Sequence, residues 1–234
     1  MKEIYFIRHG ETDWNKKNLG QGSRNDIKMN KMGEKQAQKT GKYLNKFRQQ
    51  DSKFDLIISS PMQRTKKTAE IIAKEIGYTK KIVYMDELKE RDGGLVSIGK
   101  TMDELEKDPF YDKFFDFIKL YEQLKDPIEQ ALFDEKNKVL ISKIEKKYEL
   151  ESDEELTSRI KKVLKYIEAS PFKKILVISH GGTINSINKY LLNTYDSIKG
   201  DMKNGSNCHI TMYQYDNKKY KLVIPSNTLH LGLV

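Results

Sequence analysis

Residues 4–12 read IYFIRHGET, a short apolar segment that stops at the charged pair Arg8 and His9 and the turn residue Gly10. A short apolar run of this kind is typical of a buried parallel strand. In open α/β sheets, ligands bind just beyond the carboxyl ends of such strands. The pattern therefore indicates a site at Arg8 and His9, although a single histidine at a strand end is also common as a structural residue.

The length and the cysteine content narrow the class of protein. The chain has 234 residues and one cysteine, Cys208. This length suits one domain, or one domain with a sizeable insertion. A single cysteine cannot form an intrachain disulfide, so we expect an intracellular, cytoplasmic setting. We expect neither secretion nor a membrane, because there is no signal-like apolar start and no apolar run near the ~20 residues of a membrane span.

The charge is positive but unevenly distributed. The formal net charge is +9, whereas residues 101–150 hold 13 acidic and 9 basic side chains and no arginine. A positive body suits anionic substrates such as phosphate esters, although a lysine-rich solvated surface would give the same total. Zinc-finger spacing, aromatic RNA-binding motifs and basic tails are absent from the sequence, so we expect no specific nucleic-acid partner.

Strands and helices alternate along the chain, which favours an α/β fold. Further strands are predicted at 54–59, 82–85 and 174–179, and the segments 209–215 and 220–224 flank the hairpin signal Asp216-Asn217. Helices are predicted at 31–47 with Asn30 as cap, from Pro61 to Gly77, from the capping box of Ser152 and Glu155 to Ser170, and through 184–191.

Residues 101–150 are predicted to be helical and strongly charged. Their aromatic stripe at helical spacing comprises Phe110, Phe114, Phe117, Ile118 and Tyr121. Such a stripe is more common as core packing than as a substrate wall. Because it follows directly on the loop predicted at 86–99, a lid over a site is also a candidate role.

Three strand ends carry matching chemistry: Arg8-His9-Gly10, Ser59-Ser60-Pro61 followed by Arg64, and His180-Gly181-Gly182. Parallel strands of one sheet share a carboxyl edge, so these groups can converge. Two imidazoles and two guanidiniums repel one another in an empty pocket and become favourable around a dianion such as a phosphoryl group. The glycines allow close backbone approach, and the helix starts add positive dipole ends.

Five motifs in this order resemble the histidine phosphatase superfamily, the phosphoglycerate-mutase-like fold. They are RHGETDWN at 8–15, SSPMQRTKKTAE at 59–70, LKERDGG at 88–94, ESDEELTSRI at 151–160 and ISHGGTI at 178–184. Asn204 and residues 228–231 also resemble the family's end. The resemblance implies a three-layer α/β/α fold, with residues 1–234 as a single histidine-phosphatase domain and a helical insertion or lid at about 101–150.

The resemblance also implies a mechanism. His9 would attack phosphorus and form a phosphohistidine. The phosphoryl oxygens would be held by Arg8, Arg64 and His180. Glu90 would protonate the leaving oxygen and then accept a proton from the attacking water. Further contacts with the phosphate are implied for Asn15, Gln21, Ser23 and the Gly181 amide.

Two departures from the family pattern bear on function. Position 93 is glycine where relatives usually carry an aromatic residue, and Gly99 lies nine residues after Glu90 rather than eight. Metabolic phosphoglycerate mutases of this fold carry an arginine-rich stretch in the insertion, and 101–150 has no arginine. This favours a phosphatase. A mutase-type phosphoryl transfer is the alternative, and a non-catalytic scaffold with the same fold is a second one.

The expected substrate is a small phosphate ester, such as a sugar phosphate or a phosphoglycerate. We expect no cofactor and no metal, because the sequence has no HExxH-type or clustered Cys/His site. The oligomeric state stays open, with a dimer as one expectation.

Overall fold

The computed structural model describes residues 1–46, 53–94, 98–105, 107, 123, 127–192 and 206–232. The chain divides into two compact units: residues 1–13, 26–90 and 156–234 form the first, and residues 14–25 and 91–155 form the second. The aromatic stripe and Asn204 lie outside the described residues. The single-domain organisation with an insertion stays a prediction.

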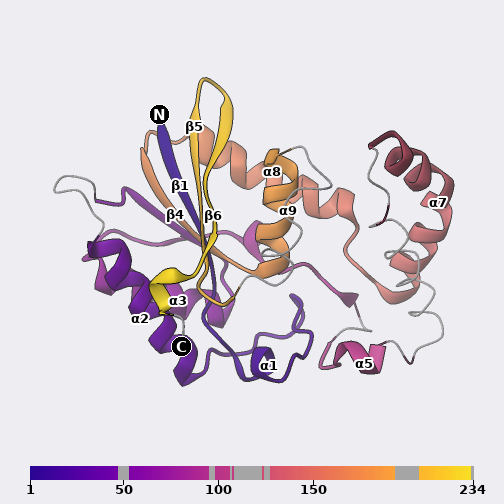
Figure 1. Ribbon diagram of the computed structural model, residues 1–234, viewed down its shortest axis with the longest axis horizontal. Coiled ribbons are helices and arrows are strands. Elements are labelled where there is room, and N and C mark those ends of the chain that lie inside the picture. Colours follow the sequence, from indigo (N-terminus) through magenta and orange to yellow (C-terminus); the bar gives the residue numbers. More distant parts are fainter. Residues whose placement is uncertain are drawn as a thin grey trace. The chain divides into compact units, whose positions relative to one another are not determined.

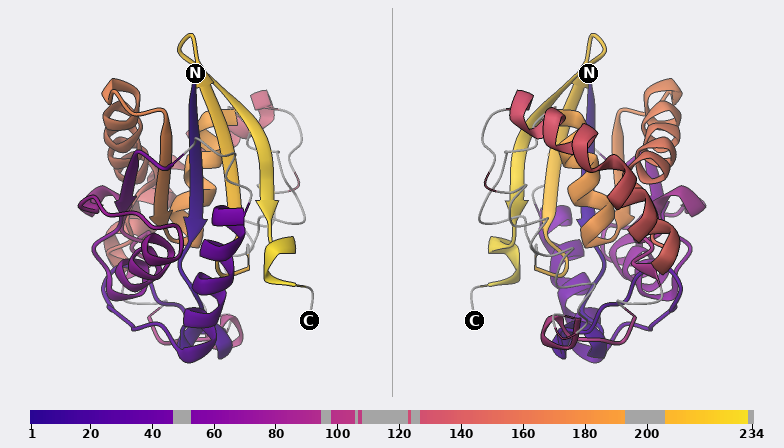
Figure 2. Two further views of the ribbon diagram at one scale, coloured as in Figure 1. Left: turned by 90° about the vertical axis from the view of Figure 1, so that its left-hand side faces the viewer. Right: turned by 90° about the vertical axis from the view of Figure 1, so that its right-hand side faces the viewer.

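The first unit is built on one sheet, which in the described part of the chain has six strands in the order β3-β2-β4-β1-β5-β6. The strands are β1 (Lys2–Arg8), β2 (Leu56–Ser59), β3 (Val83–Tyr84), β4 (Lys174–Ser179), β5 (Ile210–Asp216) and β6 (Lys219–Asn227). Strands β1 to β4 pair in parallel, whereas β5 and β6 form an antiparallel hairpin beside β1 (Figure 2). The predicted mostly parallel sheet is confirmed.

Helices cover both faces of this sheet (Figure 1). They are α2 (Lys31–Lys46) and α3 (Gln63–Glu75) on one face, and α8 (Asp153–Ala169) and α9 (Gly181–Leu192) on the other. The strands are apolar on both sides because both sides are covered. Ile57 and Ile178 pack in the cluster under α2 and α3, whereas Ile58 and Val177 pack in the cluster under α8 and α9. The predicted three-layer α/β/α arrangement is confirmed.

The helix boundaries follow from capping groups that are visible in the sequence. At the start of α2, Oδ1 of Asn30 accepts the N–H of Gly33 at 2.9 Å. Before α8, Ser152 and Glu155 each accept the other's backbone N–H through their side chains, at 3.2 and 2.9 Å. Gly77, just beyond α3, has a φ of 65°, which is typical of helix ends. These predictions are confirmed.

The turn between β5 and β6 lies one residue later than predicted. Asp216 pairs with Lys219, so the two-residue loop is Asn217-Lys218. Both loop residues have positive φ, 48° and 61°, as a type I′ hairpin turn requires. The right-handed twist of the paired strands selects this turn, and β6 continues to Asn227, three residues beyond the predicted strand.

Short helical turns occur in two segments that were predicted to be loops, α1 (Asp13–Lys16) and η1 (Asp86–Leu88). A third, η2 (Leu229–Leu231), lies in the closing segment, for which no element was predicted. Segments of three or four residues are too short to show a hydrophobic period, so sequence patterns do not reveal them.

Residues 101–150 of the second unit are largely helical where the structure describes them, in agreement with the prediction. They contain α5 (Met102–Leu105) and α7 (Pro127–Tyr148). Pro127 is the first residue of α7, the position in a helix where proline is tolerated. Among the described residues, no helix of either unit combines the length and apolar character needed to cross a membrane.

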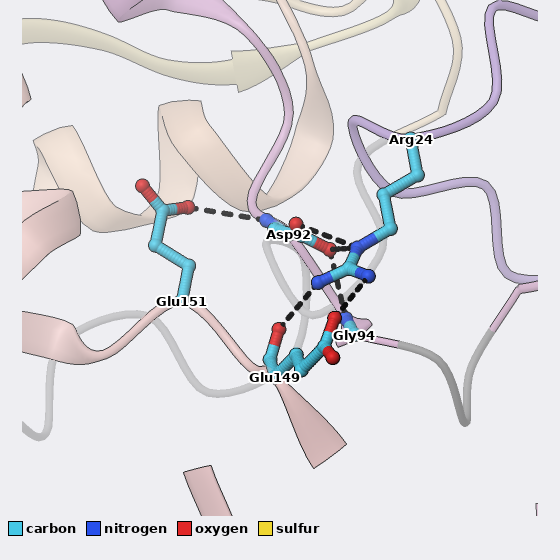
Figure 3. A network of polar contacts seen from close by, with 5 residues as sticks. All are labelled: Arg24, Asp92, Gly94, Glu149 and Glu151. Carbon is cyan, nitrogen blue, oxygen red and sulfur yellow. Dashed lines mark hydrogen bonds and ion pairs between the residues drawn. The ribbon is translucent and has the colours of Figure 1, made fainter. Parts of the chain in front are cut away.

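An ion-pair network around Arg24 joins three segments of the second unit (Figure 3). Nε of Arg24 donates to both carboxylate oxygens of Asp92, at 2.9 and 2.8 Å. Nη1 and Nη2 donate to the carboxylate and the backbone carbonyl of Glu149, each at 2.8 Å. The Asp92 N–H in turn donates to Glu151 at 3.1 Å. One planar guanidinium thereby fixes two loops against the end of α7.

Candidate active site

The first unit brings two histidines and an arginine together at the carboxyl edge of the sheet. His9 follows β1 and His180 follows β4, and their ring centroids lie 5.2 Å apart in an edge-to-face arrangement. Arg64, in the first turn of α3, donates its Nε–H to Nδ1 of His180 at 3.2 Å. All three side chains are buried. Parallel strands end at one edge, and this explains why residues between 55 and 171 positions apart meet here.

The hydrogen bonds of His9 define its tautomer. Its Nδ1 lies 2.8 Å from the carbonyl oxygen of Gly10, and a carbonyl can only accept, so Nδ1 carries the proton. Nε2 therefore keeps its lone pair. Burial, together with the positive charges of Arg64 and Arg8, holds the pKa of His9 well below its ordinary value. His9 is thus a neutral imidazole with a nucleophilic Nε2.

The tautomer of His180 is the opposite one. Arg64 can only donate, so Nδ1 of His180 accepts and Nε2 carries the proton. Nε2–H then donates to the Ser60 hydroxyl oxygen at 2.9 Å. Burial, followed by the charges of Arg64, His9, Arg8 and Arg159, keeps the pKa of His180 well below its ordinary value. In this structure, both ring nitrogens of His180 have protein partners.

Two buried guanidiniums share one carboxylate as counter-charge. Burial lowers the pKa of Arg64 to about 10 and also lowers the pKa of Arg8, while the negative charge of Glu90 opposes both shifts. The formal charges of the two guanidiniums and the carboxylate sum to one positive charge. A phosphoryl dianion would balance this excess, as the sequence predicted for the pocket.

The Glu90 carboxylate lies on the first turn of α9. Its Oε2 accepts the Gly182 N–H at 3.2 Å, and its Oε1 accepts the Thr183 N–H at 3.0 Å. The Thr183 hydroxyl lies 3.3 Å from the same oxygen. Backbone donors at a helix start stabilise an anion, so Glu90 occupies an anion position in this structure.

The glycines of the site have different roles. A Cβ atom on Gly182 would lie 2.7 Å from Oε1 of Glu90, so a glycine is needed for the carboxylate to reach α9. A Cβ atom on Gly10 would lie 2.5 Å from the carbonyl oxygen of Gly33, so Gly10 is needed for close packing on α2. The Gly10 N–H donates to the Thr68 hydroxyl at 3.0 Å, so in this structure it is directed to α3.

The N-terminus of α3 also has an internal carboxylate partner. Oδ1 of Asp26 accepts the Gln63 N–H at 2.7 Å, and the negative charge of Asp26 opposes the lowering of the Arg64 pKa. The start of α3 thus faces Asp26 and the start of α9 faces Glu90. These are the two helix starts that were predicted to contribute positive dipole ends. An incoming anion would compete with Glu90 at α9.

The remaining predicted residues are distributed over both units. Gly181 is the first residue of α9 and belongs to the first unit, whereas Asn15, Gln21 and Ser23 belong to the second. Contacts between phosphate and these four residues stay predictions.

Sequence reasoning missed several side chains that hold the site. Ser60 contacts His180 and Thr183 contacts Glu90 through their hydroxyl groups. Nδ2 of Asn207 donates to the His9 carbonyl at 3.0 Å. Ser60 and Thr183 belong to the motifs at 59–70 and 178–184, whose interpretation used only the charged residues and the glycines. Asn207 precedes β5 and has no local signal, because its partner is 198 residues away.

No group of three His, Cys, Asp or Glu side chains suited to a metal ion occurs within the residues that the structure describes. The histidines of the site are instead engaged by Gly10, Arg64 and Ser60.

Comparisons with known proteins agree with this geometry. The sequence profile of the Histidine phosphatase superfamily (branch 1) matches residues 4–228. The chain is 33% identical over 188 residues to a protein of Bacillus subtilis (strain 168) named uncharacterized phosphatase PhoE, which covers 80% of this chain and 76% of that protein.

Solved structures show the same fold. A mutant phosphoserine phosphatase from Entamoeba histolytica, in complex with phosphoserine, aligns with a TM-score of 0.69 and 24% identity over 99% of this chain and 100% of that one. A phosphoglycerate mutase from Bacillus anthracis str. Sterne aligns with a TM-score of 0.72 and 22% identity over 98% of this chain and 95% of that one. From its motifs, its fold and the profile match over nearly its whole length, the chain belongs to the histidine phosphatase superfamily (branch 1).

Proposed function

We propose that this protein is a phosphatase that hydrolyses phosphate monoesters through a phosphohistidine on His9, without a metal ion. The observation that carries the proposal is the state of His9: neutral, with its proton on Nδ1, beside the buried positive charges of Arg8 and Arg64. A neutral imidazole needs no base before it attacks, and the two guanidiniums offset the charge of a phosphoryl group.

In the first step, Nε2 of His9 attacks phosphorus in line with the leaving oxygen. The N–P bond forms as the P–O bond to the leaving group breaks. Glu90, which takes up a proton from solvent when the phosphoryl dianion binds, gives that proton to the departing oxygen. Arg8 and the guanidinium nitrogens of Arg64 bind the equatorial oxygens. His180 joins them when its Nε2–H exchanges the Ser60 oxygen for a phosphate oxygen.

In the second step, water attacks the phosphohistidine. Glu90, now ionised, takes a proton from that water, the N–P bond breaks, and inorganic phosphate leaves with His9 restored. The Glu90 carboxylate, at the end of a flexible side chain, contacts the start of α9. This position supports the proposed role. The incoming phosphate competes for those backbone donors and releases the carboxylate towards the leaving group.

The substrate class in this proposal is a small phosphate ester, such as a sugar phosphate, a phosphoglycerate or phosphoserine. A relative is named phosphatase, and one similar structure contains phosphoserine. The second candidate is mutase-type transfer, which the similarity to a phosphoglycerate mutase supports. The lack of arginine in 101–150 favours the phosphatase. A cytoplasmic location, which the single cysteine supports, completes the proposal.

The test measures both steps with one panel of substrates. We expect the wild type to release phosphate from p-nitrophenyl phosphate in the presence of chelator, and vanadate to inhibit it. Rapid quenching with labelled substrate should trap an acid-labile, base-stable phosphoryl group. His9→Ala should abolish this label, whereas the control His230→Gln should keep it. Label that persists in His9→Ala would place the nucleophile elsewhere.

Product analysis separates the two candidates. For a phosphoglycerate substrate, release of free phosphate supports the phosphatase. A phosphoryl group that reappears on another hydroxyl of the same substrate, with little free phosphate, would replace the phosphatase by the mutase.

A further inference from the structure

The loop that carries Glu90 is held by side chains rather than by a β-ladder. Three successive backbone carbonyls before the carboxylate, those of Glu87, Leu88 and Lys89, each accept a hydrogen bond from a side chain. The donors lie on α8, β4 and α9, three elements that pack on or within the sheet. The position of the Glu90 backbone is therefore set from outside its own loop.

Arg159 makes two of these bonds with one nitrogen atom. Its Nη1 lies 2.6 Å from the carbonyl oxygen of Glu87 and 2.8 Å from that of Lys89. Hydrogen bonds from a charged donor are stronger than neutral ones. Arg159 lies on α8 next to the buried residue Ile160 and is itself partly buried. Arg159 belongs to the motif at 151–160, which the proposed mechanism does not use.

Two hydroxyl groups complete the support. Oγ of Ser179 donates to the Leu88 carbonyl at 2.8 Å, and Oγ1 of Thr183 donates to the Lys89 carbonyl at 2.7 Å. Both donors adjoin the catalytic segment, since His180 follows Ser179 and α9 contains Thr183. The loop of Glu90 is thus tied to the segment that carries His180 and the anion-binding helix start.

We propose that Arg159 is a positioning residue for acid–base catalysis: it fixes the backbone at Lys89 so that the Glu90 carboxylate meets the leaving oxygen. This inference rests on the proposed function and on the role of Glu90 in it. A misplacement of a catalytic group by about 1 Å can cost on the order of 100-fold in rate. The two hydrogen bonds of Arg159 described above end on the loop of Glu90, and its charge also contributes to the lowered pKa of His180. Arg159→Lys keeps that charge, so the effect that is specific to the guanidinium passes through Glu90.

If Arg159 had only a structural role, its loss would change the rates for two phosphate esters in a different way. Protonation of the leaving oxygen matters for phenyl phosphate, whose phenolate is a poor leaving group, and matters little for p-nitrophenyl phosphate, whose phenolate is stable without a proton. The two esters have the same shape around phosphorus. A defect in the aim of Glu90 therefore lowers kcat/KM for phenyl phosphate more than for p-nitrophenyl phosphate, whereas a general loss of folded enzyme lowers both equally.

The experiment compares Arg159→Ala, Glu90→Gln and the double variant on both esters. We expect Arg159→Ala to cost at least about 10-fold more on phenyl phosphate than on p-nitrophenyl phosphate, within the range of general acid catalysis. The double variant should be no slower than Glu90→Gln alone, because both changes remove the same acid–base function. Arg159→Lys, which keeps a charged donor, should recover part of the loss.

The control is Lys165→Ala, an exposed cation on the same helix, which should leave both rates unchanged. If Arg159→Ala folds poorly, Thr183→Val removes the hydroxyl bond to the Lys89 carbonyl, together with the hydroxyl contact to Oε1 of Glu90, and should show the same preferential loss. Circular dichroism and the midpoint of thermal unfolding report on the fold of each variant.

The outcomes separate this inference from the proposed function. A wild type that forms no phosphohistidine on His9 would overturn the proposed function and the inference with it. A wild type that forms it, with equal losses on the two esters in Arg159→Ala and in Thr183→Val, would overturn the inference alone. A double variant that loses the product of the two single losses would also overturn it, because Arg159 would then act independently of Glu90.

Discussion

Gly182 and Glu90 lie so close that a Cβ atom on Gly182 would stand 2.7 Å from Oε1 of the carboxylate. The obstructed atom is the far end of a flexible side chain, so the fold can adapt while the carboxylate cannot keep its place. A methyl group added at position 182 should therefore affect turnover and stability differently.

We predict that Gly182→Ala lowers kcat for phenyl phosphate about 10- to 100-fold, because the added methyl group takes up space beside the Glu90 carboxylate and misdirects it towards the leaving oxygen. The midpoint of thermal unfolding should stay the same or rise, since alanine is the better helix former by about 0.5–1 kcal/mol. Lys189→Ala, an exposed change in α9, is the control. A wild-type kcat in Gly182→Ala would show that the observed place of Glu90 does not matter for turnover.

We predict that Glu90→Gln keeps phosphate binding but loses about 100- to 10,000-fold in kcat, because an amide neither donates nor accepts the proton that each step needs. Binding can be measured by titration with vanadate or phosphate. The Arg8 and Arg64 charges lose their nearby counter-charge in this variant, so anion affinity should rise. Unchanged turnover would remove Glu90 from its proposed role.

We predict that Arg64→Lys lowers kcat/KM about 100- to 1,000-fold, comparable to the loss of one oxyanion donor. An ammonium cannot bind His180 and two phosphate oxygens in one plane as a guanidinium can. Nitrogen NMR of His180 should show an accepting Nδ1 in the wild type and a changed Nδ1 signal in the variant. Lys67→Arg, exposed on the same helix, is the control, and activity equal to wild type in Arg64→Lys would contradict the prediction.

We predict that the free energy of unfolding falls as the pH drops below about 6.5. Burial lowers the pKa of His230 from 6.5 to about 4, and the pKa values of His9 and His180 also lie well below 6.5. The unfolded chain then binds protons that the folded chain does not, so stability is present above the unfolded pKa and is lost as the pH falls towards the folded pKa.

Urea unfolding between pH 8 and pH 4 measures this slope. Nε2–H of His230 donates to the Thr40 hydroxyl at 3.0 Å, and an amide can replace that donor. His230→Gln should therefore flatten the slope between about pH 6.5 and 4 while the activity at pH 7.5 stays intact. An equal slope in wild type and variant would show that His230 makes no contribution.

The sequence predicted the elements whose signals are local. Buried strands such as 174–179 are continuous apolar runs, and the caps at Asn30 and Ser152 combine with helical periodicity. The turn at Asn217-Lys218 was placed one residue too early, because the choice between overlapping two-residue turns depends on the register with the partner strand. Short helices such as α1 have no period to detect.

The chain by itself determined which chemical groups reach the site: His9, His180, Arg8 and Arg64 stand at strand ends or at the helix start that follows, and parallel strands end at one edge. Only the tertiary structure decided how they are used. The tautomer of His180, the contact of Glu90 with the start of α9 and the bonds of Arg159 to the Glu90 loop depend on partners 70 or more residues away, whereas the tautomer of His9 is set by its neighbour Gly10. Hydrogen bonds over such distances in the chain form only when the sheet has assembled, so no local pattern of residue types encodes them.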